Sequence, residues 1–208
     1  MTVISKRENA FKIATKIIFD EAQNQTPVVV AVDGGSGAGK SIFVRHLAEE
    51  TKAAVIPLDD FYSVEIPATK WGEYATREKL SKVFNWERLE RTALRPLLQR
   101  SVASWTTYDF TEGIQKDGTY REKSTLQKLH PADTIIIDGT YSASPEIVDL
   151  IDITILIDVP IAERHRRLDN REEVAFLKQW HQQWDEVEDY YFNEIRPKEF
   201  YDLVIENF

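Results

Sequence analysis

The residue types best suited to chemistry lie together in one glycine-rich segment. Residues 34–41 read GGSGAGKS and fit the pattern G-x-x-x-x-G-K-[ST]. Glycines let the backbone turn so that successive N–H groups point inward, where they can bind phosphate oxygens. In such a loop a lysine is suited to the β- and γ-phosphates of a nucleotide, and the hydroxyl that follows it to Mg²⁺. We therefore predict a nucleotide site made by Gly34, Gly35, Ser36, Gly37, Ala38, Gly39, Lys40 and Ser41.

The residues on either side of this segment support that prediction. The apolar run at 28–32 precedes it, and apolar residues at helical spacing follow it from Ile42 to Ala48. A glycine-rich turn without a ligand is the alternative interpretation. The full pattern arises by chance in only about one chain in a hundred of this length, and the strand and helix context makes a nucleotide site the better interpretation.

Three carboxylates follow apolar runs and are the next candidates for chemistry. Asp59 and Asp60 follow the run 54–58, and Asp138 follows the run 134–137. In open α/β sheets ligands lie beyond the carboxyl ends of the strands, so an acid at such a position can take part in chemistry. Asp138 is suited to hold Mg²⁺ directly or through a water ligand, and its alternative role is a helix cap or turn former. Either Asp59 or Asp60 can accept the proton of an attacking hydroxyl, and spacing alone does not rank them.

Short apolar runs must form the elements that position these residues. Each run is apolar on both faces or nearly so, which is typical of strands buried in a parallel sheet, and helical stretches lie between most of them. We predict an α/β fold of the P-loop NTPase type, with three layers and a mostly parallel five-stranded sheet. The five predicted strands are residues 28–32, 54–58, 134–137, 153–157 and 203–205.

The chain shows no composition change that would divide it. We therefore predict one domain over residues 1–208, with the less regular segment 62–129 inserted over the sheet. Residues 5–8 have the capping-box form S-x-x-E before a helical pattern, and a second helix is expected from Trp86, with a kink at Pro96.

Composition excludes several classes of protein. The 208 residues carry a net charge of −9, which argues against a protein that coats nucleic acid. The longest apolar runs are far shorter than the roughly 20 residues of a membrane span, so we expect no membrane partner and a cytoplasmic location. Cysteine is absent, which excludes disulfides and thiolate metal sites. The four histidines are scattered and show no metal-ligand spacing; they are His46, His130, His165 and His181.

Four landmarks together resemble the uridine kinase family of P-loop kinases over nearly the whole chain after Thr26. The first is the glycine-rich segment. The sequence DDFY at 59–62 is similar to the family's D-x-F-Y motif, and the resemblance implies that Asp59 rather than Asp60 is the catalytic base. The sequence YDF at 108–110 is similar to part of the family's nucleoside pocket. The resemblance therefore implies an acceptor site that includes Tyr62, Tyr108 and Phe110.

The same resemblance includes a residue that would hold the metal ion and a segment that would form a lid. Asp138 with its following glycine resembles the family's acid-Gly step, with Asp in place of the usual Glu. Residues 164–180 resemble a short form of the family's lid. Its arginines at 164, 167 and 171 share one helical face, where Arg164, Arg167 and Arg171 are suited to stabilise charge on the transferring phosphoryl group. A solvated basic face that pairs with neighbouring glutamates is the alternative.

The resemblance implies an ATP- and Mg²⁺-dependent kinase that moves the γ-phosphoryl group to a hydroxyl of a small molecule, with a nucleoside as one acceptor. Asp59 and Lys40 would be catalytic, together with the three arginines. One departure concerns the acceptor: Gly113 and Gln115 stand where the family has His and Arg beside the pyrimidine. The alternative function is a nucleotide-dependent regulatory ATPase or switch without a small acceptor. The sequence leaves the acceptor, the choice of ATP or GTP and the oligomeric state open.

Overall fold

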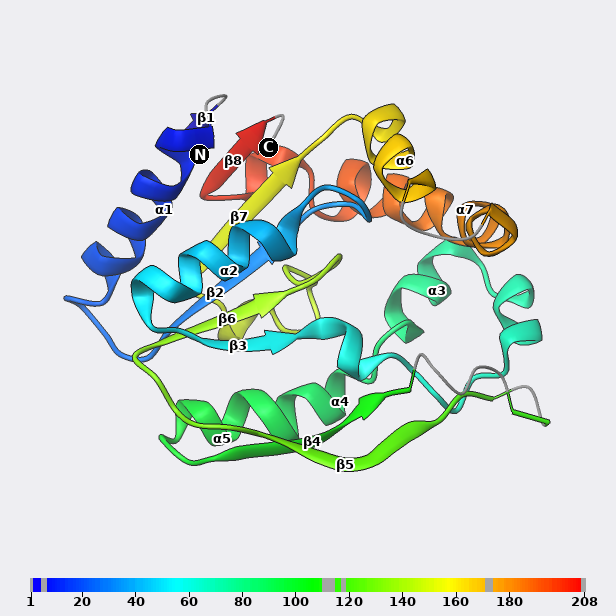
Figure 1. Ribbon diagram of the computed structural model, residues 1–208, viewed down its shortest axis with the longest axis horizontal. Helices are drawn as coiled ribbons and strands as arrows, with labels where there is room; N and C mark the ends of the chain where they lie inside the picture. The colour runs from blue at the N-terminus through cyan, green and yellow to red at the C-terminus, as the bar shows by residue number, and fades with distance from the viewer. Residues whose placement is uncertain (1, 5–6, 110–114, 117–118, 171–173, 207–208) are drawn as a thin grey trace. The chain divides into compact units, whose positions relative to one another are not determined.

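The computed structural model describes residues 2–4, 7–109, 115–116, 119–170 and 174–206. The chain divides into two compact units (Figure 1). The first, which we call the sheet unit, comprises Met1–Ile56 and Ala132–Phe208. The second, the insert unit, comprises Pro57–Pro131.

The sheet unit is built on six strands in the order β1-β8-β7-β2-β6-β3 (Figure 1). The pairs β1–β8, β8–β7, β7–β2 and β2–β6 are all parallel. This confirms the predicted α/β fold with a mostly parallel sheet. The strands are β1 (Thr2–Ile4), β2 (Val28–Asp33), β3 (Ala54–Pro57), β6 (Thr134–Asp138), β7 (Ile153–Asp158) and β8 (Leu203–Glu206).

The predicted number of five strands was wrong because β1 was missed. This strand has only three residues, and its formation depends on pairing with β8, where Thr2 lies beside Leu203 and Ile4 beside Ile205. A three-residue segment carries too little alternation to predict a strand from pattern alone. The edge position of β1 also leaves Val3 half exposed, so its composition gives no sign of burial.

Apolar residues pack on both faces of this sheet and create its core. Helices α1 (Arg7–Glu21) and α2 (Lys40–Thr51) lie on one face, where the rings of Phe11 and Phe43 stack with centroids 5.0 Å apart (Figure 1). All six residues of β2 are buried, as expected for a strand in the middle of a parallel sheet. The core on this face includes Ala10, Ala14, Ile18, Val28, Val30, Val32, Phe43, Val44 and Leu47. A smaller cluster on the other face contains Ala31, Ala143, Leu156, Tyr201 and Val204.

Two further helices follow β7 in the sheet unit. Helix α6 (Ile161–Asp169) leads into α7 (Val174–Tyr190), which continues as a π-helical turn at Tyr191–Ile195. Both helices lie beyond the carboxyl end of β7 (Figure 1). None of the helices in the described part of the chain is long and apolar enough to cross a membrane.

The insert unit combines short helices with one antiparallel hairpin. Strand β4 (Ala103–Tyr108) pairs antiparallel with β5 (Glu122–Leu129). Its helices are α3 (Thr76–Lys82), α4 (Trp86–Leu89) and α5 (Arg95–Leu98), with 3₁₀ turns at Leu58–Phe61 and Ala68–Glu73. A π-helical turn at Glu90–Leu94 separates α4 from α5, whose second residue is Pro96. Proline lacks an N–H group and its ring clashes with the fourth preceding carbonyl, which accounts for the predicted irregularity at this point.

Candidate functional site

The loop between β2 and α2 has the backbone conformation that its glycines predict. Gly34, Gly37 and Gly39 have φ angles of 145°, 81° and 97°, a region that residues with a side chain rarely adopt. A Cβ atom at Gly34 would also lie 2.5 Å from the carbonyl oxygen of Ile157 on β7. Gly39 forms the N-cap of α2, so the positive end of this helix lies at the loop. Such a loop is suited to bind an anion such as a phosphate.

The structure brings Lys40, Ser41 and Asp138 together at the carboxyl ends of two neighbouring strands. In the register of β2 and β6, Val32 lies beside Asp138, so the loop begins next to this carboxylate. Lys40 Nζ donates hydrogen bonds to the carbonyl oxygens of Gly34 (2.9 Å) and Gly35 (3.2 Å), and to Thr140 Oγ1 (3.0 Å). The lysine charge therefore lies within the loop.

One carboxylate oxygen of Asp138 is buried without a hydrogen-bond partner among the described residues, beside Ser41. Burial raises the pKa of the Asp138 carboxyl, while the nearby Lys40 charge and a hydrogen bond with the Ser41 side chain oppose the rise. Its Oδ1 atom is buried, and no described group forms a hydrogen bond with it. A buried carboxylate oxygen without a partner, next to a serine hydroxyl, fits a hard cation such as Mg²⁺.

The predicted lid arginines contact the carbonyl oxygens of the loop. Arg164 Nη1 on α6 donates to the carbonyl oxygen of Ser36 (3.1 Å) and to Glu188 Oε2 on α7 (2.6 Å). Arg167 Nη1 donates to the carbonyl oxygen of Ala38 (3.1 Å). Arg167 also pairs with Glu163, as the solvated-face alternative expects. Both arginines thus hold the loop by its carbonyl oxygens, and their role toward a phosphoryl group stays a prediction. Arg171 lies outside the described residues.

Glu188 completes this contact and was not predicted. Its side chain is almost fully buried, and Oε1 accepts hydrogen bonds from the backbone N–H (3.0 Å) and the hydroxyl (2.6 Å) of Ser36. A cavity of about 650 Å³ opens beside Gly35, Arg164 and Glu188. Nothing in the sequence distinguishes Glu188 from the other acids of α7, because its role depends on how this helix packs against the loop.

Asp33 is a second residue that sequence reasoning missed. It ends β2 directly before the loop and is completely buried. Its two oxygens accept hydrogen bonds from the backbone N–H groups of Gly34 (2.7 Å), Tyr141 (2.9 Å) and Ala143 (3.2 Å). They also accept from the hydroxyls of Tyr191 (2.7 Å) and Tyr201 (2.9 Å). Burial raises the pKa of Asp33, and the hydrogen bonds from Tyr191, Gly34, Tyr201 and Ala143 oppose the rise.

Asp33 therefore joins three parts of the sheet unit: the start of the loop, the segment after β6, and the end of the chain around Tyr191 and Tyr201. The segment after β6 needs this support because Tyr141 has a φ of 72°. A signal was present in the sequence. A single acid at the end of a run that is otherwise apolar must be paired if the run is buried.

In the insert unit, the neighbours Asp59 and Asp60 have different surroundings. Both lie in the 3₁₀ turn after β3, and Asp59 is exposed whereas Asp60 is half buried. Asp60 Oδ2 accepts a hydrogen bond from Trp105 Nε1 (2.9 Å), and its carbonyl oxygen accepts from Arg88 Nη2 (2.6 Å). Burial raises the pKa of Asp60, and the bond with Trp105 opposes the rise. Asp60 is thus held by its own unit.

The aromatic residues predicted to bind the acceptor cluster within the insert unit. The rings of Tyr62 and Tyr108 meet edge to face with centroids 5.6 Å apart, and Tyr62 also packs on Phe84 at 4.7 Å. Burial raises the pKa of the Tyr108 phenol, and the neighbouring Tyr120 adds to the rise. Phe110 lies outside the described residues, as does Gly113. The structure thus groups two of the three predicted acceptor residues, and their role stays a prediction.

Comparison with known proteins gives distant relatives that include uridine kinases. No protein-family model matches the chain. A uridine kinase of Lactobacillus helveticus (strain DPC 4571) is 26% identical over 184 residues, which cover 83% of this chain and 79% of the relative. A uridine kinase of Limosilactobacillus reuteri (strain DSM 20016) is 25% identical over 194 residues, 85% of each chain. The solved structure of a possible uridine kinase from Bacillus stearothermophilus has a TM-score of 0.69, with 16% identity over 95% of this chain and 98% of that chain, and therefore shares the fold.

Proposed function

Because the chain is a distant homologue of the uridine kinase-like P-loop kinases, we propose that it transfers the γ-phosphoryl group of ATP to a hydroxyl of a nucleoside-like small molecule. The observation that carries this proposal is the arrangement of Lys40, Ser41 and Asp138 around the glycine loop at the carboxyl ends of β2 and β6. A cation from Lys40, a hydroxyl and a buried carboxylate are the groups that phosphoryl transfer by a P-loop kinase requires.

Binding of ATP would use the loop and the helix that follows it. The backbone N–H groups of the loop and the N-terminus of α2 would bind the phosphates, and Lys40 would leave the carbonyl oxygens of Gly34 and Gly35 to contact the β- and γ-phosphates. Ser41 and Asp138 would hold Mg²⁺, which neutralises charge on the phosphates when it is bound. The free Oδ1 atom of Asp138 supports its part in this site.

Transfer also needs a base and an acceptor site. Asp59 would accept the proton of the attacking hydroxyl, because it is exposed and stands at the first Asp of the D-x-F-Y motif. Arg164 and Arg167 would hold the loop in its binding conformation through its carbonyl oxygens. The aromatic cluster of Tyr62 and Tyr108 would form one wall of the acceptor site.

The alternative function is a regulatory ATPase without a small acceptor. A protein of that kind needs the loop but has no use for a base. The similarity to a uridine kinase over 83% of the chain favours the kinase.

A ligand screen tests the proposal. Melting temperature is measured with a non-hydrolysable ATP analogue and Mg²⁺, alone and with nucleosides, vitamins or sugar phosphates, because a ligand of the folded state raises it. We expect a further rise with at least one hydroxyl compound. Because Gly113 and Gln115 replace the residues that usually hold the pyrimidine, uridine and cytidine should give kcat/KM values below about 10⁴ M⁻¹s⁻¹. If no compound adds to the rise given by the ATP analogue, the regulatory ATPase becomes the better account.

A further inference from the structure

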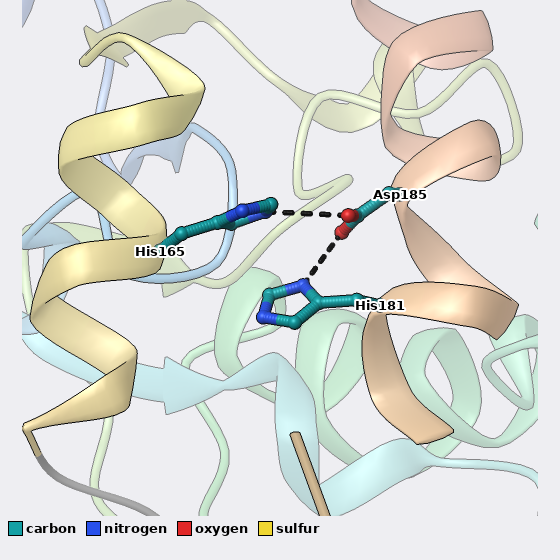
Figure 2. Close-up of side chains that lie close together, drawn as sticks. All are labelled: His165, His181 and Asp185. Carbon is teal, nitrogen blue, oxygen red and sulfur yellow. Dashed lines mark hydrogen bonds and ion pairs between the residues drawn. The ribbon is translucent and has the colours of Figure 1, made fainter. Parts of the chain in front are cut away.

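Two histidines and an aspartate from neighbouring helices converge beside the arginine and glutamate that hold the loop, and the proposed reaction uses none of the three. His165 lies on α6, and His181 and Asp185 lie one turn apart on α7, with all three side chains directed toward one another (Figure 2). His165 Nε2 is 3.2 Å from Asp185 Oδ2, and His181 Nδ1 is 3.0 Å from Asp185 Oδ1. One ligand atom from each of the three residues lies within 4.8 Å of the others.

We infer that these three side chains form a binding site for a divalent transition-metal ion of the Zn²⁺ class. Two imidazoles and one carboxylate are ligands that such ions prefer, and three protein ligands leave a fourth position open. With metal bonds of about 2.0 to 2.2 Å, two ligand atoms of a tetrahedral site lie about 3.3 Å apart. Each histidine nitrogen is about this far from an oxygen of Asp185, although the two nitrogens contact different oxygens, and one ligand atom from each residue lies within 4.8 Å of the others. An ion would draw these atoms together by rotation of the side chains.

The surroundings of the cluster favour entry of an ion. The side chains of His165 and Asp185 are each 31% exposed and that of His181 is 21% exposed, and Asp185 also lines the 650 Å³ cavity beside the loop. The Nε2 atom of His165 is buried, and its contact with Asp185 lacks the alignment of a hydrogen bond. This nitrogen is therefore a buried polar atom without a hydrogen bond in the described part of the chain, and a metal ion would give it a partner.

The position of the cluster gives such an ion a structural effect. His165 follows Arg164 on α6, and Asp185 lies one turn before Glu188 on α7. Arg164 and Glu188 bind each other and the backbone of Ser36 in the loop. An ion bound between His165, His181 and Asp185 would link α6 to α7 directly beside this contact, and would stabilise the pair of helices that holds the loop.

The test uses the full chain without an affinity tag, since a histidine tag binds the same ions. Co²⁺ serves as a visible probe and Zn²⁺ as its competitor, both in excess Mg²⁺ so that oxygen-rich sites are occupied. We expect one Co²⁺ per chain, with visible absorption bands that one equivalent of Zn²⁺ abolishes. At 100 times its dissociation constant, Zn²⁺ should raise the melting temperature by about 5 °C or more.

Substitutions of the three proposed ligands, together with a control histidine elsewhere in the chain, test where the metal binds. His165→Ala, His181→Ala and Asp185→Asn should each weaken Zn²⁺ binding by more than about 100-fold, beyond the 10- to 100-fold cost of losing a residue behind the ligands. His130→Ala in the exposed part of the insert unit is the control and should bind as the wild type does. The inference is overturned if the wild type binds no Co²⁺ at one equivalent, or if His130→Ala weakens binding as much as the three ligand variants. The first of these readouts needs no variant to fold.

Discussion

Replacing Asp33 with asparagine should destabilise the sheet unit far more than a surface change of the same size. The carboxylate is completely buried and accepts five hydrogen bonds, three of them from backbone N–H groups. Asparagine has only one acceptor oxygen, and its NH₂ group would face N–H and hydroxyl groups that now donate hydrogen bonds to the carboxylate. The hydroxyls of Tyr191 and Tyr201 can rotate to accept a hydrogen bond, but a backbone N–H cannot.

The magnitude follows from the two carboxylate oxygens. If the amide oxygen takes the place of Oδ1, it keeps the bonds from Gly34 and Tyr141, and the N–H of Ala143 is left without a partner. A buried N–H without a partner costs about 1 to 3 kcal/mol, and the remaining bonds lose their charge assistance, which adds about 1 kcal/mol. We therefore expect Asp33→Asn to lower the free energy of unfolding by about 2 to 4 kcal/mol, or the melting temperature by about 5 to 15 °C.

Urea unfolding followed by circular dichroism measures this effect, and Tyr201→Phe provides the matched control. That variant removes one donor from Asp33 but leaves no N–H group without a partner, so it should cost about 1.5 kcal/mol. The double variant tests coupling, because contacting residues give non-additive effects. If Asp33→Asn unfolds at the same urea concentration as the wild type, Asp33 does not join the loop to the rest of the unit. The same conclusion follows if it lowers the free energy of unfolding no more than Tyr201→Phe does.

Three further predictions concern the reaction. Lys40→Ala should nearly abolish phosphoryl transfer with circular dichroism unchanged, since it removes the cation aimed at the phosphates; transfer at the wild-type rate would refute the site. Ser41→Ala should weaken the dependence of transfer on Mg²⁺, and an unchanged Mg²⁺ titration would count against this ligand. Asp59→Asn should lower turnover by about 10²-fold or more at constant ATP affinity, because it removes the proposed base. Asp60→Asn should lower turnover much less, because the amide oxygen of asparagine can still accept the hydrogen bond from Trp105. If Asp60→Asn had the larger effect, Asp60 would be the base.

Short sequence patterns predicted those parts of the fold and the site that are formed by residues close together in the sequence. The glycine loop, the strand before it and the helix after it all lie within residues 28–51, so one motif and one apolar run predict them. Asp138 could also be placed, because parallel strands present their carboxyl ends at the same edge of the sheet. The strand β1 could not, because its three residues form a strand only through pairing with β8.

Residues whose roles depend on helix packing could not be predicted. Glu188 lies among other acids on α7, and only the approach of this helix to the loop gives it a role. The same reason explains why the histidines showed no metal-ligand spacing in the sequence. His181 and Asp185 are four residues apart, but His165 comes from a different helix, and the cluster exists only where α6 and α7 lie together.

The most direct test of the proposed kinase is a single-turnover experiment with ATP labelled in the γ-phosphate. Enzyme in excess over ATP is mixed with Mg²⁺ and the hydroxyl compound that gives the largest rise in melting temperature, and labelled acceptor is separated from labelled inorganic phosphate. The account predicts that the label moves mainly to the acceptor, and that Asp59→Asn slows this transfer by about 10²-fold or more. Label that appears only as inorganic phosphate, at a rate that Asp59→Asn does not change, would contradict it.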